Sequence, residues 1–266
     1  MEQTFSIKNL SKHYQDFSLQ NINLSLPKGT ILGLIGENGA GKSTIIKCLL
    51  NLIHRDNGEI TIFDQTLEQN PKKIKDQIGV VFDECHFHGI LNLKQINKIM
   101  KYSYTKWDEK RFFKLCWQFQ LPEHKKIQTY SRGMQMKLSL ACALSHHAKL
   151  LILDEPTSGL DPIMQNKFVE LIKSEKHKGK TIFMSSHIFE EVENTCDRIL
   201  MVKDGNLVAD KGIQDIRNAN KKHYTITFAS SEYAKNFAQI HREVDLTGIA
   251  GYLSFLIIPL IACYVN

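Results

Sequence analysis

Directly after the apolar run Ile31–Ile35 comes the stretch Gly36-Glu37-Asn38-Gly39-Ala40-Gly41-Lys42-Ser43. It has the complete G-x-x-x-x-G-K-[ST] pattern. Glycines at these spacings let backbone N–H groups turn inward around a phosphate chain, and a helix that follows them directs its positive end toward the same anion. The lysine is expected to reach the outer phosphates, and the serine hydroxyl to hold a magnesium ion. The residues predicted to contact the nucleotide here are Gly36, Glu37, Asn38, Gly39, Ala40, Gly41, Lys42, Ser43 and Thr44.

Five short, nearly continuous apolar runs predict a mainly parallel sheet. They lie at residues 31–35, 78–82, 150–153, 181–185 and 199–202. Strands that are buried on both faces have this composition, and they occur in sheets covered by helices. Residues 3–26 instead alternate apolar and polar side chains, which predicts half-buried antiparallel strands. The predicted fold class is therefore α/β: a P-loop NTPase with a mainly parallel sheet and an antiparallel β subdomain.

Apolar residues at helical spacing predict helices between these strands. One apolar stripe runs through residues 45–53, directly after the phosphate loop. Asp161 followed by Pro162 is typical of a helix start, and Gly179 of the matching end. Residues 84–145 contain helical spacing but no comparable strand pattern, so we expect them to form a helical lobe inserted into the sheet domain.

The chain is predicted to consist of one large domain and a smaller carboxyl-terminal part. We assign residues 1–215 to the large domain and residues 216–245 to a linker and the start of a small extension, with a strand near 224–228 and a helix near 232–240. Residues 246–266 form an apolar tail without a charged side chain, long enough for a membrane span. A tail anchor, a segment covered by a partner, and a truncated or frameshifted reading frame all fit this tail.

Composition and charge exclude several classes of protein. The 266 residues include 34 Lys+Arg and 28 Asp+Glu, so the net charge of +6 is mild, and no run of like charges suggests a nucleic-acid-binding arm. The six cysteines form no C-x-x-C pair, which argues against a disulfide framework or a zinc ribbon and suits a reducing cytosol. The first residues contain no apolar segment of the kind found in secretory signals, so we expect the chain to start in the cytoplasm.

A pair of carboxylates completes the predicted site. Asp154 and Glu155 follow the apolar run 150–153, and ligands of open α/β sheets bind at this end of the strands. Asp154 is expected to support Mg²⁺ through its water shell, and Glu155 to polarise a water for attack on the γ-phosphate. Together with the phosphate loop, the pair predicts hydrolysis of ATP, with ATP and Mg²⁺ as cofactors.

These motifs, in this order, resemble those of the ATP-binding cassette family, the nucleotide-binding subunits of ABC transporters. Tyr130-Ser131-Arg132-Gly133-Met134 occupies the place of the family's LSGGQ signature, and residues 154–162 resemble its second nucleotide motif and the D-loop. The resemblance implies that Asp161 of this loop also contacts the nucleotide. His187 matches the switch histidine, and Tyr14 is similar to the aromatic residue that stacks on adenine. The resemblance covers roughly residues 3–215. Within the family, the chain is similar to the ATPases of antibiotic, peptide and bacteriocin exporters.

The resemblance implies a mechanism that requires two copies. Two cassettes would pack head to tail, with each ATP held between Lys42 of one subunit and Ser131 and Gly133 of the other. Glu155 would orient the attacking water, with Lys42 and His187 stabilising charge. The dimer would drive separate membrane permease subunits from the cytoplasmic face of the membrane, with no nucleic acid as partner.

Asp83 departs from the family pattern, because the family usually places glutamine there. A carboxylate at this position can still hold Mg²⁺ or its water, so Asp83 joins Ser43 and Asp154 as a predicted metal-site residue. Arg132 and Met134 depart from the signature. Two alternatives therefore stay open: an ABC ATPase that does not serve transport, and a regulatory cassette that hydrolyses ATP poorly.

A separate group of residues raises the question of a second metal site. Cys85, His86 and His88 carry metal-ligating side chains at close spacing. No second ligand pair accompanies them, which favours ordinary loop residues.

Overall fold

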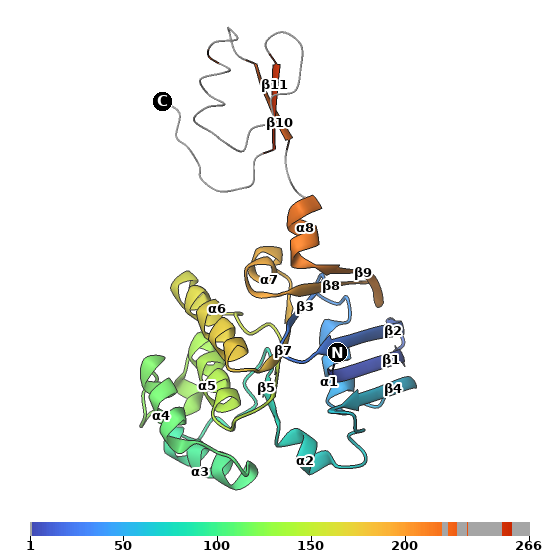
Figure 1. Cartoon of the computed structure of the whole chain (residues 1–266). Helices are drawn as coiled ribbons and strands as arrows, with labels where there is room; N and C mark the ends of the chain where they lie inside the picture. Colours follow the sequence, from blue (N-terminus) through green and yellow to red (C-terminus); the bar gives the residue numbers. More distant parts are fainter. Residues whose placement is uncertain (1, 220–222, 228–232, 234–251, 257–266) are drawn as a thin grey trace. The chain divides into compact units, whose positions relative to one another are not determined.

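A computed structural model of the chain describes residues 2–219, 223–227, 233 and 252–256 (Figure 1). The chain divides into two compact units, Met1–Gly212 and Ile213–Asn266.

A six-stranded sheet with the order β5-β6-β7-β3-β8-β9 forms the centre of the first unit. Its strands are β3 (Ile31–Ile35), β5 (Ile78–Val81), β6 (Leu150–Leu153), β7 (Thr181–Ser186), β8 (Arg198–Lys203) and β9 (Asn206–Gly212). The first five strands in this order are parallel, and β9 pairs antiparallel with β8. The predicted parallel sheet is confirmed, since each of the five apolar runs lies in one of its strands.

A second, antiparallel sheet has the order β2-β1-β4. Its strands are β1 (Gln3–His13), β2 (Ser18–Pro27) and β4 (Asn57–Ile62). The apolar faces of both sheets and of helix α1 (Lys42–Leu49) form one buried core, in which Phe5 of β1 contacts Phe183 of β7 with ring centroids 5.3 Å apart. Helix α1 is shorter than the apolar stripe 45–53 predicts. Ile53, the last residue of the stripe, lies beyond the end of the helix and packs, partly buried, against the core.

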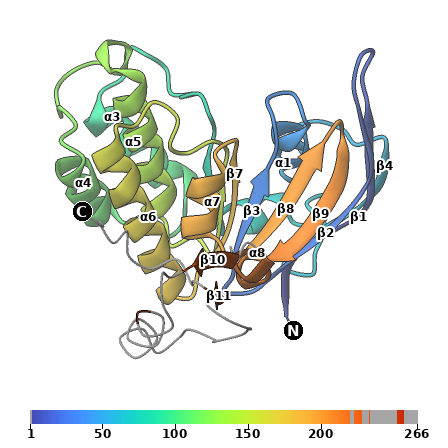
Figure 2. The ribbon, with the colours of Figure 1, turned by 90° about the horizontal axis from the view of Figure 1, so that it is seen from above.

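The remaining helices of the first unit are α2 (Pro71–Lys75), α3 (Leu93–Ser103), α4 (Glu109–Gln118), α5 (Arg132–Leu144), α6 (Pro162–His177) and α7 (Phe189–Thr195), with a short 3₁₀ helix η1 (Ile127–Thr129). Of these, α2, α5, α6 and α7 pack against the six-stranded sheet, and α4 packs on α5 with α3 beside it. Figures 1 and 2 both show α3, α4 and α5 on one side of this sheet and the β2-β1-β4 sheet on the other. The segment predicted as a helical lobe, residues 84–145, holds α3, α4, η1 and α5 and no strand.

Helix α6 begins and ends where its sequence predicts. Asp161 is the N-cap, and its Oδ1 accepts a hydrogen bond of 3.0 Å from the backbone N–H of Met164. Pro162 is the first helical residue, where its missing N–H costs nothing. Gly179 follows the last turn with a φ of +85°, a conformation that favours glycine.

The second unit contains helix α8 (Ile213–Ala219) and an antiparallel pair of strands, β10 (His223–Thr227) and β11 (Tyr252–Leu256). Helix α8 lies where the rise in polarity suggested a linker, and β10 covers most of the strand predicted near 224–228. The helix predicted near 232–240 lies, except for Tyr233, outside the described residues. So does the apolar tail, except for β11, and its three interpretations stay predictions. Across the described residues, no helix is both apolar enough and long enough to span a membrane.

A buried ionic cluster joins α4 to α6. The Glu175 side chain has no exposed surface, and it accepts from Arg111 of α4 and from Lys178, both at 2.7 Å, while Lys180 Nζ lies 2.8 Å away. Burial by itself raises the pKa of Glu175, but the hydrogen bonds from the two lysines and the charge of Arg111 outweigh it and lower the pKa to about 2. The carboxylate is thus ionised at neutral pH and compensates several cations.

Replacing this carboxylate should destabilise the first unit. We expect Glu175→Gln to lower the free energy of unfolding by ~3 kcal/mol at pH 7, because it leaves the nearly buried Lys180 and the partly buried Arg111 without their carboxylate. The folded-state pKa lies below the ordinary value of 4.5, so the stabilisation is complete above that pH and is lost as the pH falls toward 2. Urea unfolding at several pH values should show the difference from wild type shrinking over this range. Glu170→Gln, at an exposed position of the same helix, is the control.

Candidate active site

The predicted catalytic and metal-site residues lie at one edge of the six-stranded sheet, whereas Tyr14, Ser131 and Gly133 lie outside the segments that follow these strands. Four neighbouring strands, β5, β6, β7 and β3, are parallel and end at this edge. Asp83 follows β5, Asp154 and Glu155 follow β6, His187 follows β7, and the phosphate loop 36–43 follows β3. The strand order therefore brings together four segments that are far apart in the sequence.

The phosphate loop is closed around the side chain of Lys42. This residue is only 5% exposed, and its Nζ donates to the backbone oxygens of Gly36 at 2.7 Å and Glu37 at 3.1 Å. Gly41 precedes α1 with a φ of +111°, and a Cβ there would lie 2.6 Å from a methyl group of Leu19. Only glycine fits at this position, so the loop can pass tightly from β3 into the helix.

Of the three predicted catalytic residues, Glu155 contacts both of the others, Lys42 and His187. Oε1 of Glu155 lies 3.3 Å from Nζ of Lys42, and its Oε2 lies 2.7 Å from Nδ1 of His187. Glu155 has a φ of +47°, an uncommon left-handed conformation for a residue other than glycine. Its backbone N–H donates to Oγ of Ser185 at 3.0 Å. The carboxylate is thus held between two groups that can carry positive charge.

Asp154 lies deeper, with 3% of its surface exposed. Burial raises its pKa, and the charges of Glu155 and Asp83 act in the same direction, while hydrogen bonds from Ser185 and Ser43 lower it. The Ser185 hydroxyl donates to Oδ1 of Asp154 at 2.5 Å. Carboxylates and a hydroxyl are the hard oxygen donors that Mg²⁺ prefers, so Asp154, Ser43 and Asp83 form a donor set that fits this ion.

The signature segment packs against the loop that precedes α6. Ser131 is the N-cap of α5, and its Oγ accepts a hydrogen bond of 3.3 Å from the N–H of Met134. A Cβ on Gly133 would lie 2.6 Å from the backbone oxygen of Gly159, so the close approach requires glycine. The first turn of α5 thus offers its N-terminal N–H groups next to an exposed serine, an arrangement that can bind an anion.

Tyr14 lies in the turn between β1 and β2. Its ring is 47% exposed, and its N–H donates to the backbone oxygen of Phe17 at 2.8 Å. Nζ of Lys12 lies 5.5 Å from the centroid of the ring and 2.8 Å from Oδ1 of Asp56. The exposed aromatic ring can stack on a base, as the resemblance implies.

Ser185 is a site residue that the sequence patterns did not single out. It contacts both Asp154 and the backbone of Glu155. Its position at the end of β7, two residues before His187, was the available signal, but a serine in a buried strand has many ordinary roles. Another missed contact is an ion pair of 2.6 Å between Arg132 and Asp83.

The alternative of a second metal site near Cys85 gains no support. Within the part of the chain that the structure describes, no group of three or more His, Cys, Asp or Glu side chains could hold a metal ion. The ring of His86 instead packs near Phe82, with centroids 5.3 Å apart. This agrees with the interpretation as ordinary loop residues.

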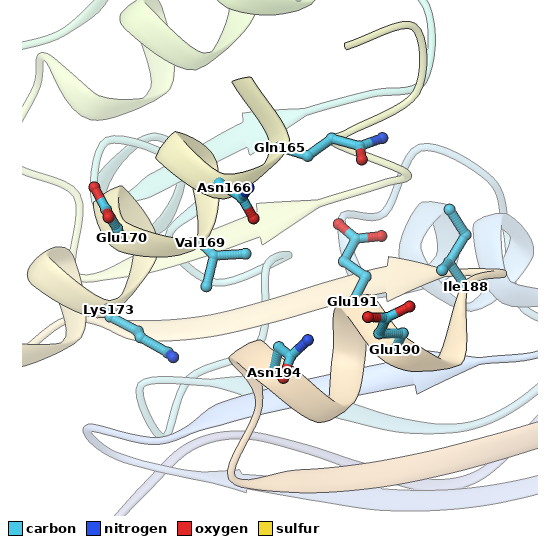
Figure 3. Close-up of a pocket in the computed structure, with 9 residues that line it drawn as sticks. All are labelled: Gln165, Asn166, Val169, Glu170, Lys173, Ile188, Glu190, Glu191 and Asn194. Atoms are coloured by element: carbon cyan, nitrogen blue, oxygen red, sulfur yellow. The ribbon is translucent and has the colours of Figure 1, made fainter. Parts of the chain in front are cut away.

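A separate pocket lies between α6 and α7 and has a volume of about 570 Å³ (Figure 3). Its lining residues are Gln165, Asn166, Val169, Glu170, Lys173, Ile188, Glu190, Glu191 and Asn194. None of them is a predicted nucleotide or metal contact. The pocket nevertheless adjoins the sheet-edge site, since Ile188 follows His187 and Glu191 accepts a hydrogen bond of 2.6 Å from the Ser186 hydroxyl.

Comparison with known proteins identifies the family. The sequence profile described as "ABC transporter" matches residues 19–158. The chain belongs to the ABC transporter family. It is similar to the bacitracin transport ATP-binding protein BcrA of Enterococcus faecalis, with 33% identity over 84% of this chain and 74% of that protein. The lantibiotic transport ATP-binding protein SrtF of Streptococcus pyogenes is 37% identical over 77% of this chain and 89% of its own.

Solved structures agree with this assignment. A structure described as the ATP-binding subunit of an ABC transporter has a TM-score of 0.75 and 28% identity, and the match covers 81% of this chain and 92% of that one. A dimeric cassette in a post-hydrolysis state, bound to ADP and Pi, has a TM-score of 0.70 and 24% identity over 79% of this chain and 98% of its own. The second similarity supports the fold. The expected P-loop cassette fold of this ABC transporter ATP-binding domain is thus confirmed.

Proposed function

We propose that this chain is the ATP-hydrolysing subunit of an exporter and drives a separate membrane permease from the cytoplasmic face of the membrane. The proposal rests on the contacts of Glu155 with Lys42 of the phosphate loop and with His187. The names of BcrA and SrtF, which concern transport of bacitracin and of a lantibiotic, support a peptide antibiotic as the class of cargo. The permease would choose the individual substrate.

In the proposed site, Glu155 orients the water that attacks the γ-phosphate, and Lys42 and His187 stabilise the charge that develops on the phosphate oxygens. The other residues of the loop 36–44 bind the phosphate chain through their N–H groups. Ser43, Asp154 and Asp83 would hold Mg²⁺, which neutralises phosphate charge when bound. Tyr14 stacks on the base, and Asp161 keeps the start of α6 beside the signature segment.

The site is proposed to be completed by a second copy. Ser131 and Gly133 place the N-terminal end of α5 against the loop before α6, where the helix end can bind a phosphate. A head-to-tail dimer would bring this helix end onto the nucleotide of the other subunit. A solved relative of the same fold is dimeric, which supports this arrangement.

Complementation between two defective chains tests the shared site. We expect Lys42→Met and Ser131→Glu to hydrolyse ATP slowly when each is assayed alone, the second because a carboxylate repels the phosphate chain. Mixing the two in equal amounts should restore about a quarter of the wild-type turnover, because random pairing makes about half of the dimers mixed and one of the two sites in each mixed dimer keeps an intact loop and an intact signature. Phosphate release is measured across mixing ratios.

The control pair replaces Ser131→Glu by Ser103→Glu, an exposed serine at the end of α3, which should stay active alone. Turnover of the mixture that never exceeds the sum of the separate chains would contradict the shared site. Absence of ATP hydrolysis by the wild type, with and without its permease, would favour the regulatory alternative.

A further inference from the structure

Two residues that depart from the family pattern contact each other in the structure. Arg132 replaces a signature glycine at the first position of α5, and Asp83 stands where the family usually has glutamine after β5. Nη2 of Arg132 donates to Oδ1 of Asp83 at 2.6 Å, although the residues are 49 positions apart. The ion pair therefore links the predicted helical lobe to the edge of the sheet.

The side chain of Arg132 also contacts the loop before α6. Gly159 has a φ of +76°, and a Cβ there would lie 3.2 Å from Cγ and 3.4 Å from Cδ of Arg132. The aliphatic part of the arginine thus crosses the loop while its guanidinium reaches Asp83. The guanidinium of Arg132, a residue of the signature segment, thus lies beside Asp83, a predicted metal-site residue of the same chain.

Asp83 lies within electrostatic reach of the proposed magnesium site. Its negative charge acts to raise the pKa of Asp154, although burial of Asp154 is the larger cause. Val81 of β5 pairs with Leu153 of β6, so the two chain segments leave the sheet side by side. Asp83 therefore has two possible cationic partners: Arg132, which it has here, and Mg²⁺ brought in with a nucleotide.

We propose that Arg132 is a positioning residue that occupies Asp83 in the nucleotide-free chain and competes with Mg²⁺ for its carboxylate. Loading of the metal site then releases the first turn of α5, which carries Ser131 and Gly133. The inference rests on the proposed function. Because the side chains of Arg132 and Asp83 are 60% and 44% exposed, the pair is weak, and we expect an effect of about two- to fivefold.

The test measures binding of a fluorescent, ribose-labelled ATP analogue as a function of Mg²⁺ concentration. Arg132→Gln should lower the Mg²⁺ concentration at half-saturation by about two- to fivefold. In the Asp83→Asn background, Arg132→Gln should leave the Mg²⁺ concentration at half-saturation unchanged, since the carboxylate for which Arg132 and Mg²⁺ compete is absent. Arg55→Gln, which breaks the 3.2 Å contact of another partly exposed arginine with Glu68, is the matched control and should leave the midpoint unchanged.

A second readout follows α5 itself. In the nucleotide-free state, the amides of residues 131–134 should exchange faster in Arg132→Gln than in the wild type. Mg²⁺ with a non-hydrolysable ATP analogue should release Arg132 in the wild type, so that its exchange at these amides becomes equal to that of the variant. An unchanged Mg²⁺ midpoint in Arg132→Gln would overturn the proposal. So would a shift that persists with Asp83→Asn, which would mean that the arginine acts directly on the nucleotide. A wild type that binds no nucleotide at any Mg²⁺ concentration would instead overturn the proposed function itself.

Discussion

Glu155→Gln should slow ATP hydrolysis by at least about a hundredfold while the protein still binds ATP. The amide keeps the size of the side chain but cannot take up a proton or orient water as a carboxylate does. The two oxygens of the Glu155 carboxylate lie 3.3 Å from Nζ of Lys42 and 2.7 Å from Nδ1 of His187, so the substitution removes the negative charge that lies between these two side chains. Phosphate release reports turnover, and fluorescence of a labelled ATP analogue reports binding.

The variant should also shift the protein toward dimers in the presence of ATP, because the nucleotide that joins the subunits is no longer consumed. Light scattering with and without Mg²⁺-ATP measures this shift. Glu190→Gln, an exposed glutamate three residues after His187, is the matched control and should behave like wild type. Turnover of Glu155→Gln within threefold of wild type would remove Glu155 from the catalytic step.

Lys42→Met should weaken ATP binding by about a hundredfold or more. Methionine has nearly the length of lysine, so the substitution removes the charge with little change in packing. In the nucleotide-free chain Nζ donates to two backbone oxygens of the loop, and with ATP bound it would donate to phosphate instead. Hydrogen bonds to charged groups contribute about 1.5–3 kcal/mol each, so the loss of two corresponds to at least about a hundredfold in affinity. Titration with the labelled ATP analogue measures the change.

Lys47→Met provides the control for this substitution, because Lys47 is exposed and lies in the last turn of the same helix. Both proteins should keep nearly the thermal stability of the wild type. Wild-type affinity in Lys42→Met would mean that the loop binds the triphosphate through its N–H groups alone.

The sequence predicted the elements whose residues carry strong local signals. The five buried strands have continuous apolar runs, and α6 has both its Asp161 cap and its Gly179 end. Strands β4 and β9 were not predicted. Each contains few apolar residues in a polar stretch, and each becomes a strand because a neighbouring strand pairs with it, β1 in one case and β8 in the other. Pairing across the chain is a property of the tertiary structure.

The candidate site divides in a similar way. The phosphate loop and the Asp154-Glu155 pair could be predicted, because each combines several residue types at a spacing that ordinary turns and strand ends do not require. The role of Ser185 as hydrogen-bond donor to Asp154 could not, since a hydroxyl in a buried strand carries no signal of its own until β7 lies beside β6.

By itself, the order of residues determined that this chain has a phosphate loop, a pair of acids after a buried strand, and a helix that begins at Asp161, because each depends on neighbours within a few positions. Only the folded chain decided that Arg132 meets Asp83 and that Glu155 lies between Lys42 and His187. These contacts join segments 32 to 113 residues apart. Their existence depends on the order of parallel strands in the sheet, which no local pattern of side chains specifies.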